Sequence, residues 1–485
     1  MRTSRNLKRT TVASVLLLLG ALALVSSKAE TLKRQDIRTF SQNPQNVDNL
    51  RRAVASLQSR GFDDQTAWFN MAGIHHFPAN DPDANKVPAP IRALYRQCHR
   101  DTYLFFLWHR AYVSAMERLM QAAINDPTFR IPYWDWYHDP KLPEIFRSEF
   151  LGAQKTVKNS LYVKDRNPGI NNGEDVWTPV IATDFNESDF RIFQTNLDGA
   201  EHGDIHMGVG NPANMGSIQT AARDPIFWLH HANIDRLLVV WLKRDLATHR
   251  VPNTFPSWIA SRYRFPTPNG GGVATPSVED LALASMSALG YEYENTNGPE
   301  LPSPTVPARP ATVQSTAGKA GVMGAGVEAF AVKKSIEVGA GATVDLPVPS
   351  AAANKFRSLE SKEPESLQAV NVVLSGVKLL SQPTGVLSYR VYLNLPKEAG
   401  RAENFKDYYL GNISLFALTA ADEHHEEIKL PATKNIEKLT KETAEAPSQI
   451  SVSVVPVLAP KATPPAQPVL KIGEIRLEGA KSPGR

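Results

Sequence analysis

Apolar residues recur at helical spacing in two stretches of the first half of the chain. From Thr102 to Asn125 and from Asp224 to Leu246, apolar residues or histidines follow one another at steps of three and four. This spacing predicts two helices, each with one buried face. In the second stretch, we expect Asp224 to cap the helix and Pro225 to take its first position. The predicted buried faces consist of Phe105, His109, Tyr112, Met116, Leu119 and Ala123, and of Phe227, His231, Ile234, Leu238 and Trp241.

The period of the pattern changes to two in the second half. There, Leu387, Tyr389, Val391, Leu393 and Leu395 alternate with mostly polar residues, and Ile450, Val452 and Val454 alternate with serines. Such strands, separated by Pro and Gly turns, predict a β-sandwich or barrel of about 150 residues. The stretch before it is rich in Pro, Gly and Ala, which is typical of a linker. We therefore expect a mainly α domain at residues 30–295, a linker at 296–326 and a β-sandwich-like domain at 327–485.

The N-terminus has the pattern of a secretion signal. A basic stretch precedes a largely apolar run of 14 residues from Val12 to Val25, and small residues follow at Ser27 and Ala29. Because a membrane span needs about 20 apolar residues, this run is short for an anchor. We expect residues 1–29 to be a signal peptide and the mature protein to be secreted or periplasmic, with a permanent anchor as the alternative.

Composition narrows the possible partners and metal ligands. With 42% hydrophobic and 21% charged residues, the 485-residue chain resembles an ordinary globular protein, which excludes collagen, coiled coil and wholesale disorder. The net charge of +4 comes from the first 29 residues, since 48 basic residues face 49 acidic ones in the rest. We therefore expect no nucleic-acid partner and, after signal cleavage, no membrane partner. A single cysteine excludes a disulfide framework within the chain and a thiolate-cage metal site.

Nine of the twelve histidines lie between positions 75 and 231, in groups. His109 and His231 belong to the predicted buried faces, where an unpaired imidazole would be costly and a metal ion would satisfy it. His202 and His206 are four residues apart, so on a helix both rings can meet one ion. Their spacing resembles that of a zinc protease, but Gly203 stands where such an enzyme needs its glutamate. The carboxylate motifs of di-iron bundles are also missing. A site of imidazoles alone suits copper, and six imidazoles could hold two copper ions.

Two longer motifs resemble those of one family of copper proteins. DPIFWLHHANIDR (224–236) resembles the second copper motif of the tyrosinase, catechol oxidase and molluscan-type haemocyanin family, and FFLWHRAYVSAMER (105–118) with IPYWDW (131–136) resembles the first. The resemblance runs from about residue 35 to Tyr293, where GYEY (290–293) is similar to the tyrosine motif that closes the catalytic core of plant-type members. VYLNLP (391–396) and YLGNISLFAL (409–418) resemble the β-rich domain of plant-type polyphenol oxidases. The resemblance implies a type-3 dicopper site in a four-helix bundle.

Carried over position by position, the resemblance also implies the ligands. The first copper would bind His75, His99 and His109, and the second would bind His202, His206 and His231. The family uses the second member of the His-His pair, so His230 is expected beside the metal and not on it. His75 is preferred to His76 because it matches the family's Ile-His-x-x-Pro pattern. Phe227 and other apolar neighbours would keep the pocket dry.

The first copper motif departs from the family pattern in two ways. His99 lies ten residues before His109, where the family has nine, and Arg100 occupies the expected ligand position. Because arginine stays protonated, it cannot bind the metal. Either His99 binds through a longer loop, which we favour, or the first site is defective. Some members carry Cys-x-His with the sulfur bonded to the ring, but Cys98 directly precedes His99, so a buried free thiol is an equal alternative.

Outside these groups, no further histidine is expected to bind metal. His138, His249, His424 and His425 fit none of the family patterns. Arg110, Asp235 and Arg236 belong to the copper motifs, and we expect them to pin helices together as an ion pair.

The resemblance implies an oxidase that uses O2 to convert o-diphenols to o-quinones, without an organic cofactor. Members with strong monophenolase activity often have asparagine after the first ligand of the second copper. Because Gly203 stands there, diphenol oxidation is favoured over the alternative, a tyrosinase that also hydroxylates monophenols. An O2 carrier of the haemocyanin kind is less favoured, since the chain is a single short unit. In plant-type relatives the β-domain covers the dicopper pocket, and we expect the same here. The alternative is that it only stabilises the protein or binds a partner.

Overall fold

The computed structural model describes residues 32–78, 80–98, 105–252, 263–269, 273–274, 281, 289–318, 321–324, 327–357, 359, 367–382, 384–419, 427–442 and 447–481. The expected signal peptide, His99, Arg100, His424 and His425 lie outside these residues. Within them, no helix combines the length and the apolar character needed to cross a membrane.

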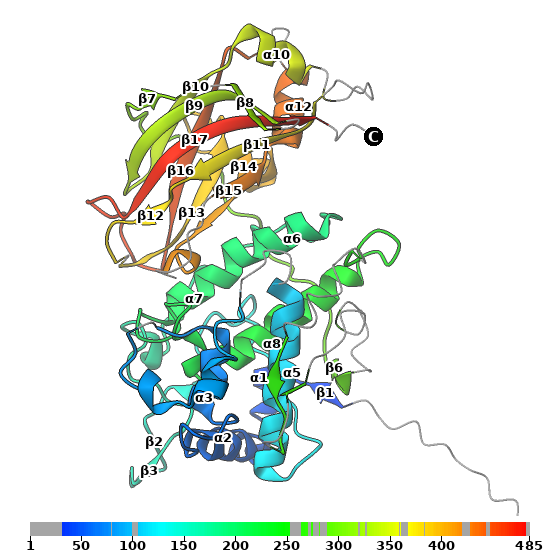
Figure 1. Ribbon diagram of the computed structural model, residues 1–485, viewed down its shortest axis with the longest axis vertical. Helices are drawn as coiled ribbons and strands as arrows, with labels where there is room; N and C mark the ends of the chain where they lie inside the picture. Colours follow the sequence, from blue (N-terminus) through cyan, green and yellow to red (C-terminus); the bar gives the residue numbers. More distant parts are fainter. Residues whose placement is uncertain are drawn as a thin grey trace, which may run out of the picture. The chain divides into compact units, whose positions relative to one another are not determined.

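The first half of the described chain is built mainly of helices (Figure 1). These are α1 (Ile37–Phe40), α2 (Pro44–Gln58), α3 (Trp68–His75), α4 (Ala89–Arg92), α5 (Phe105–Ile124), α6 (Phe190–Leu197), α7 (Gly203–Val209) and α8 (Ile226–Leu242). Only short strand pairs accompany them, namely β1 (Lys33–Arg34) with β6 (Glu292–Tyr293), β2 (Phe150–Leu151) with β3 (Val157–Lys158), and β4 (Phe265–Pro266) with β5 (Val273–Ala274).

Helices α5 and α8 correspond to the two helices that the sequence pattern predicts. Helix α8 begins at Ile226, with Pro225 as its N-cap, and the Asp224 carboxylate accepts a hydrogen bond from the Ile226 N–H at 3.1 Å. It ends at Leu242, earlier than the expected Leu246, because Asp245 turns the chain by accepting from the Ala247 N–H at 2.9 Å. Every residue of α8 is buried, although the pattern predicted one buried face. The helix therefore runs through the middle of the helical part.

A buried ion-pair network joins α5 to α8, as the sequence analysis expected for Arg110 and Asp235. Nε of Arg110 lies 2.5 Å from Oδ1 of Asp235. The hydroxyls of Tyr291 and Tyr293 donate to Oδ2 of Asp235 at 2.6 and 2.7 Å, so the GYEY segment closes this part of the core. Burial alone would raise the pKa of Asp235, but Arg110 and Arg34 outweigh it and hold that pKa below its usual value. Arg236 pairs separately, with Asp135 at 2.8 Å.

The second half forms two β-sheets (Figure 1). One has the order β10-β16-β13-β14, with β10 (Ala342–Pro347), β16 (Gln449–Leu458), β13 (Val386–Leu393) and β14 (Tyr409–Ser414). The other has the order β15-β11-β17-β9-β7, with β15 (Glu427–Pro431), β11 (Leu367–Ser375), β17 (Leu470–Lys481), β9 (Val327–Val338) and β7 (Thr316–Ala317), while β12 (Lys378–Leu379) pairs with β17 and β8 (Gly321–Gly324) with β9. Among the described residues of this half, the sheets are accompanied by the helices α10 (Ser350–Phe356), α11 (Phe405–Tyr408) and α12 (Thr433–Glu442). The Tyr389 hydroxyl donates to the carbonyl of Gly339 at 2.9 Å and so links β13 to the end of β9.

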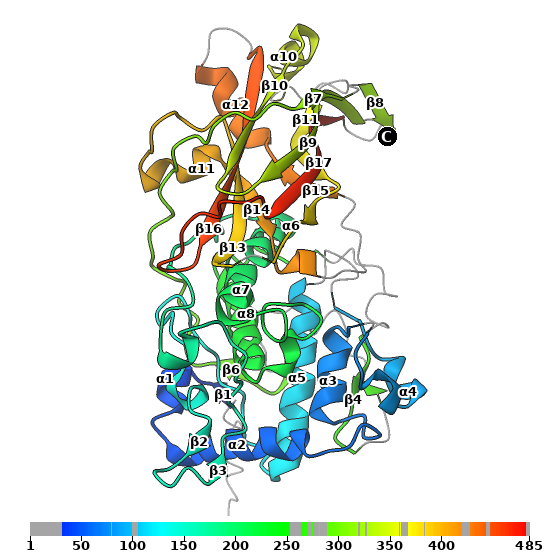
Figure 2. The same ribbon diagram turned by 90° about the vertical axis from the view of Figure 1, so that its left-hand side faces the viewer.

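Strand β13 departs from the alternation that predicted it. The apolar face of β13 is buried as expected, but Ser388 and Tyr392 on the opposite face are buried as well. Ser388 is covered because β13 contacts α7 beside Asp204, and Figure 2 shows the two elements side by side. The Tyr392 ring is covered by Phe405 and Tyr409, at centroid distances of 6.0 and 5.9 Å. A strand that is covered on both faces loses the exposed side from which the period of two arises.

The segment expected to be a linker is partly paired with the sheets. Val306 is fully buried and forms a bridge with Gly400, and β7 and β8 hydrogen-bond to β9. Arg309 forms an ion pair with Asp345 at 2.5 Å. Strand pairing thus begins ahead of residue 327, within the range that composition assigned to the linker. Residues 32–485 form one compact unit.

Candidate metal centre

Six buried imidazoles converge from helices that are far apart in the sequence. His75 is the last residue of α3, and His109 lies in the first turns of α5. His202 ends a π-helical turn (Asp198–His202) that continues directly into α7, which carries His206. His230 and His231 lie on α8. None of the six side chains is more than 1% exposed, so water cannot satisfy their ring nitrogens.

The first group of possible ligand atoms comprises His75, Cys98 and His109, whose donor atoms lie within 4.8 Å of one another. Nδ1 of His75 lies 3.0 Å from the carbonyl of Ile218, and Nδ1 of His109 lies 2.7 Å from the carbonyl of Phe105. A carbonyl can only accept, so each Nδ1 carries the proton. Each Nε2 is then left with a lone pair, which is the tautomer that a metal ligand needs.

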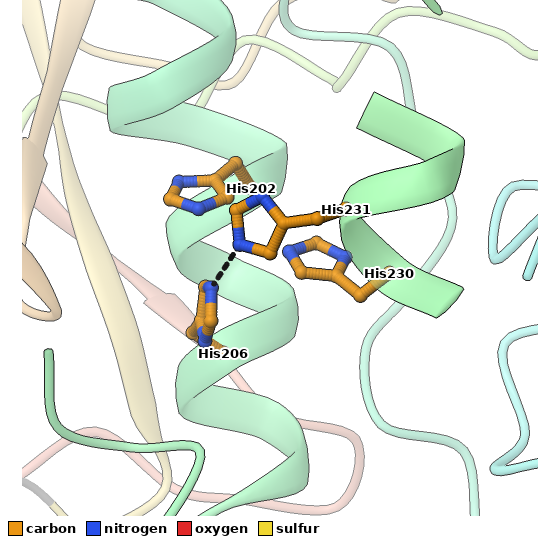
Figure 3. Close-up of side chains that lie close together, drawn as sticks. All are labelled: His202, His206, His230 and His231. Carbon is orange, nitrogen blue, oxygen red and sulfur yellow. Dashed lines mark hydrogen bonds between the residues drawn. The ribbon is translucent and has the colours of Figure 1, made fainter. Parts of the chain in front are cut away.

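The second group comprises His202, His206, His230 and His231 (Figure 3). One ring nitrogen of each lies within 4.8 Å of those of the others. Nδ1 of His206 donates to the carbonyl of Met215 at 3.0 Å, and its Nε2 faces Nε2 of His231 at 3.3 Å. Two nitrogens that bind one ion at about 2.0–2.1 Å with a tetrahedral angle stand about 3.3 Å apart. The separation of His206 and His231 therefore fits a shared metal ion.

His230 differs from the other three in its hydrogen bonding. Its Nδ1 accepts from Nε1–H of Trp136 at 3.0 Å. In a neutral imidazole the other nitrogen must then carry the proton, so Nε2 of His230 has no lone pair to offer a metal. The contact with Trp136 therefore favours His231 over His230 as the ligand, a choice that helical spacing alone could not make.

The two groups lie directly against each other. The rings of His109 and His231 stack with centroids 4.1 Å apart and planes 12° apart. Burial and the neighbouring imidazoles lower the pKa values of His206, His230 and His231 well below the ordinary value, so these rings are neutral at pH 7. Neither group contains a carboxylate, and imidazole donors suit copper, as the sequence implied.

The remaining described histidines have other partners. His76 accepts from the N–H of Phe77 at 2.9 Å and belongs to neither group. His138 pairs with Asp135 at 2.9 Å, and His249 packs on Trp241 with ring centroids 4.9 Å apart. Of the expected ligands, the structure therefore brings together His75 with His109, and His202 with His206 and His231. His99 lies outside the described residues.

Phenylalanine rings pack against the histidines of both groups, and Phe105 lies 4.9 Å from His109 and 4.7 Å from His202 between ring centroids. Phe227 on α8, expected from the motif, lies 4.1 Å from His231 and 5.0 Å from His75 between ring centroids. Phe416, which follows β14, stacks on His206 with centroids 3.8 Å and planes 7° apart. Phe416 lies in the YLGNISLFAL segment, but an apolar residue near a strand end does not indicate what it covers.

The strands next to Phe416 also touch the ligand-bearing helix. A Cβ atom placed on Gly203 would stand 2.5 Å from Oγ of Ser414 on β14, so glycine permits this close approach. Asp204 is buried in the same contact near Ser388 and Arg390 of β13, and burial raises its pKa to about 7. The second half of the chain thus lies on α7 at the residues between the two histidines.

Within the part of the chain that the structure describes, three lysine–carboxylate pairs lie around this contact, and their charges are arranged in the same sense. Each lysine comes from the β-rich half and each carboxylate from the helical half. The pairs are Lys406 with Asp184 at 2.7 Å, Lys434 with Glu187 at 3.0 Å and Lys461 with Glu174 at 3.2 Å. The lysines are more than half exposed, so salt in solution screens these pairs.

Comparison with known families agrees with the geometry. Residues 65–178 and 153–244 match the family described as the common central domain of tyrosinase, and residues 319–477 match a domain of unknown function, DUF7868. The two segments that match the tyrosinase domain together contain His75, His109, His202, His206 and His231.

Individual relatives are similar over most of the chain at modest identity. Tyrosinase HcTyr1 of Hahella sp. is 28% identical over 412 residues, which are 76% of this chain and 82% of the relative. The chloroplastic polyphenol oxidase of Malus domestica is 27% identical over 360 residues, and the match spans 58% of that protein's length. Among solved structures, latent apple tyrosinase has a TM-score of 0.58 at 20% identity, covering 93% of this chain and 97% of the apple chain, which shows a shared fold.

Proposed function

Because this chain belongs to the tyrosinase and polyphenol oxidase family of copper oxidoreductases, whose cofactor is a pair of copper ions, we propose that it oxidises o-diphenols to o-quinones with O2. The observation that carries this proposal is the pair of adjacent, buried imidazole groups on helices of the family's common domain. When bound, the copper pair supplies the exchange of two electrons between each diphenol and O2.

We propose His75, His99 and His109 as ligands of the first copper, and His202, His206 and His231 as ligands of the second. The carbonyls of Ile218, Phe105 and Met215 support three of these assignments, because they hold the Nδ1 protons of His75, His109 and His206. A ring fixed in this way needs no change of tautomer when the metal arrives. That the helices around the copper pair form a four-helix bundle stays a prediction.

Phe227 and Phe416 would keep water from the ligand rings, and an aromatic substrate would have to take the place of one of them. Phe416 lies flat on His206 at 3.8 Å, the distance at which a phenol ring would stack on a ligand histidine. We therefore propose that the β-rich half shields the site and that Phe416 occupies the position of the substrate ring. The boundary between the two halves, near residue 295, is part of the same proposal.

The choice between diphenols and monophenols rests on Gly203. Without a side chain, this residue cannot help to take the proton from a monophenol, whereas an o-diphenol is oxidised more readily. The close contact of Gly203 with Ser414 offers a second reason for glycine, independent of the substrate. Hydroxylation of monophenols remains the second candidate activity, and export by an N-terminal signal remains a prediction.

Oxygen uptake by the copper-loaded full chain tests the activity. Catechols, monophenols and o-aminophenols are supplied one by one while O2 and quinone are followed together. We expect catechol turnover with two diphenols consumed per O2 and slower turnover of monophenols. Reversible O2 binding without turnover of any phenol, before and after opening of the shield, would instead identify a carrier.

A further inference from the structure

The sulfur of Cys98 points into the first imidazole group. Its Sγ atom lies 3.5 Å from Nε2 of His109, and the three donor atoms of His75, Cys98 and His109 fall within 4.8 Å. Cys98 is 1% exposed. We infer that Cys98 is a ligand of the first metal ion, bound as a thiolate beside His75 and His109. This inference rests on the proposed metal centre and changes its donor set.

The distance agrees with ligation. An ion that binds sulfur at about 2.3 Å and a ring nitrogen at about 2.0–2.1 Å with a tetrahedral angle holds the two donors about 3.5 Å apart. The separation of Sγ and Nε2 in this chain is 3.5 Å. His109 holds its other nitrogen on the carbonyl of Phe105, so Nε2 is the atom that faces both the sulfur and the site.

The backbone fixes the sulfur in this place. The N–H groups of Arg96, Gln97 and Cys98 donate to the carbonyls of Gly73, Ile74 and His75 at 3.1, 2.9 and 3.2 Å, respectively. These are the last carbonyls of α3, which have no partner within the helix. The loop that carries Cys98 is therefore tied to the end of the helix that carries His75, residue against residue, and the two side chains are held together.

The sequence supports the same assignment. His99 is displaced by one residue from the position that the family uses, and Arg100 at that position cannot bind. A thiolate from Cys98 would give the first ion a third donor that does not depend on the displaced loop. Binding would release the thiol proton to solvent, and the sulfur would favour Cu(I) and Zn²⁺ more than an all-imidazole site does.

Cobalt titration of the metal-free full chain tests the inference, because Cys98 is the chain's single cysteine. A sulfur-to-cobalt charge-transfer band in the near ultraviolet can then come from this residue alone. We expect the band in the wild-type protein, its loss in Cys98→Ser and His109→Ala, and its retention in His206→Ala, which serves as the matched control in the second group. X-ray absorption of the copper-loaded protein should show one sulfur at about 2.3 Å.

Three results would overturn the inference. These are a wild-type protein that binds cobalt without the band, a copper site with only nitrogen and oxygen neighbours, or an intact mass lower by two hydrogens, which would place the sulfur in a covalent bond to a ring. None of these measurements uses phenol oxidation. Failure of the proposed activity would therefore leave the band intact, and failure of the inference would leave an active dicopper enzyme.

Discussion

Replacing Phe416 by alanine should activate the intact chain. The ring is 1% exposed, stacks on His206 at 3.8 Å and meets His202 edge-on at 5.7 Å. Truncating a buried phenylalanine costs about 3–5 kcal/mol. We assign about half of this free energy to the contact between the β-rich half and α7. The form in which that contact is broken then becomes about 10–100-fold more populated, because each 1.4 kcal/mol changes the equilibrium constant tenfold. The cavity left above His206 would also admit a phenol ring directly.

The assay is the initial rate of catechol oxidation by copper-loaded, uncleaved protein. Phe416→Ala should raise kcat/KM by about tenfold or more, within the range worked out above. Phe356→Ala is the matched control, because Phe356 is also 1% exposed but packs on Phe330 in the β-rich half, at a centroid distance of 5.4 Å. It should lower stability without raising the rate. A Phe416→Ala protein that is folded, copper-loaded and no more active than wild type would refute the shielding role.

Three further outcomes follow from the geometry. His231→Ala should empty the second copper site, whereas His230→Ala should reduce activity by about 10–100-fold and keep its copper; equal copper loss in both would contradict the ligand assignment. Asp235→Asn should lower the free energy of unfolding by about 3–5 kcal/mol in urea titrations, because it leaves buried arginines uncompensated, and an effect near zero would show that the network is dispensable. Lys434→Glu, which faces Glu187, should raise catechol turnover a few-fold at low salt, with the difference vanishing at high salt; a difference that does not depend on salt would exclude an electrostatic origin.

The sequence predicted those parts of the site that repeat with a helical period. His109 and His231 sit on apolar stripes, so their burial followed from spacing, and the match to the copper motifs supplied the partners that spacing could not provide. The distinction between His230 and His231 needed a contact from Trp136, 94 residues earlier in the chain, which no local pattern contains.

The fold was less predictable where surfaces meet. The alternation in β13 indicated a strand with one exposed face, but Ser388 is buried beside Asp204 of α7, and Tyr392 is buried against Phe405 and Tyr409. Phe416 could not be identified for the same reason, since its role arises only when the β-rich half lies on α7. Contacts between segments about 200 residues apart leave no period in the sequence, so only the folded chain reveals them.

Elemental analysis of the purified full chain after copper-replete expression tests the dicopper centre most directly. Five buried ligand imidazoles in two adjacent groups, with His99 as the sixth proposed ligand, predict two copper ions per chain, and His206→Ala should reduce the number to one. Two zinc ions in place of copper, or a wild-type protein that holds no more than one copper ion, would contradict the account.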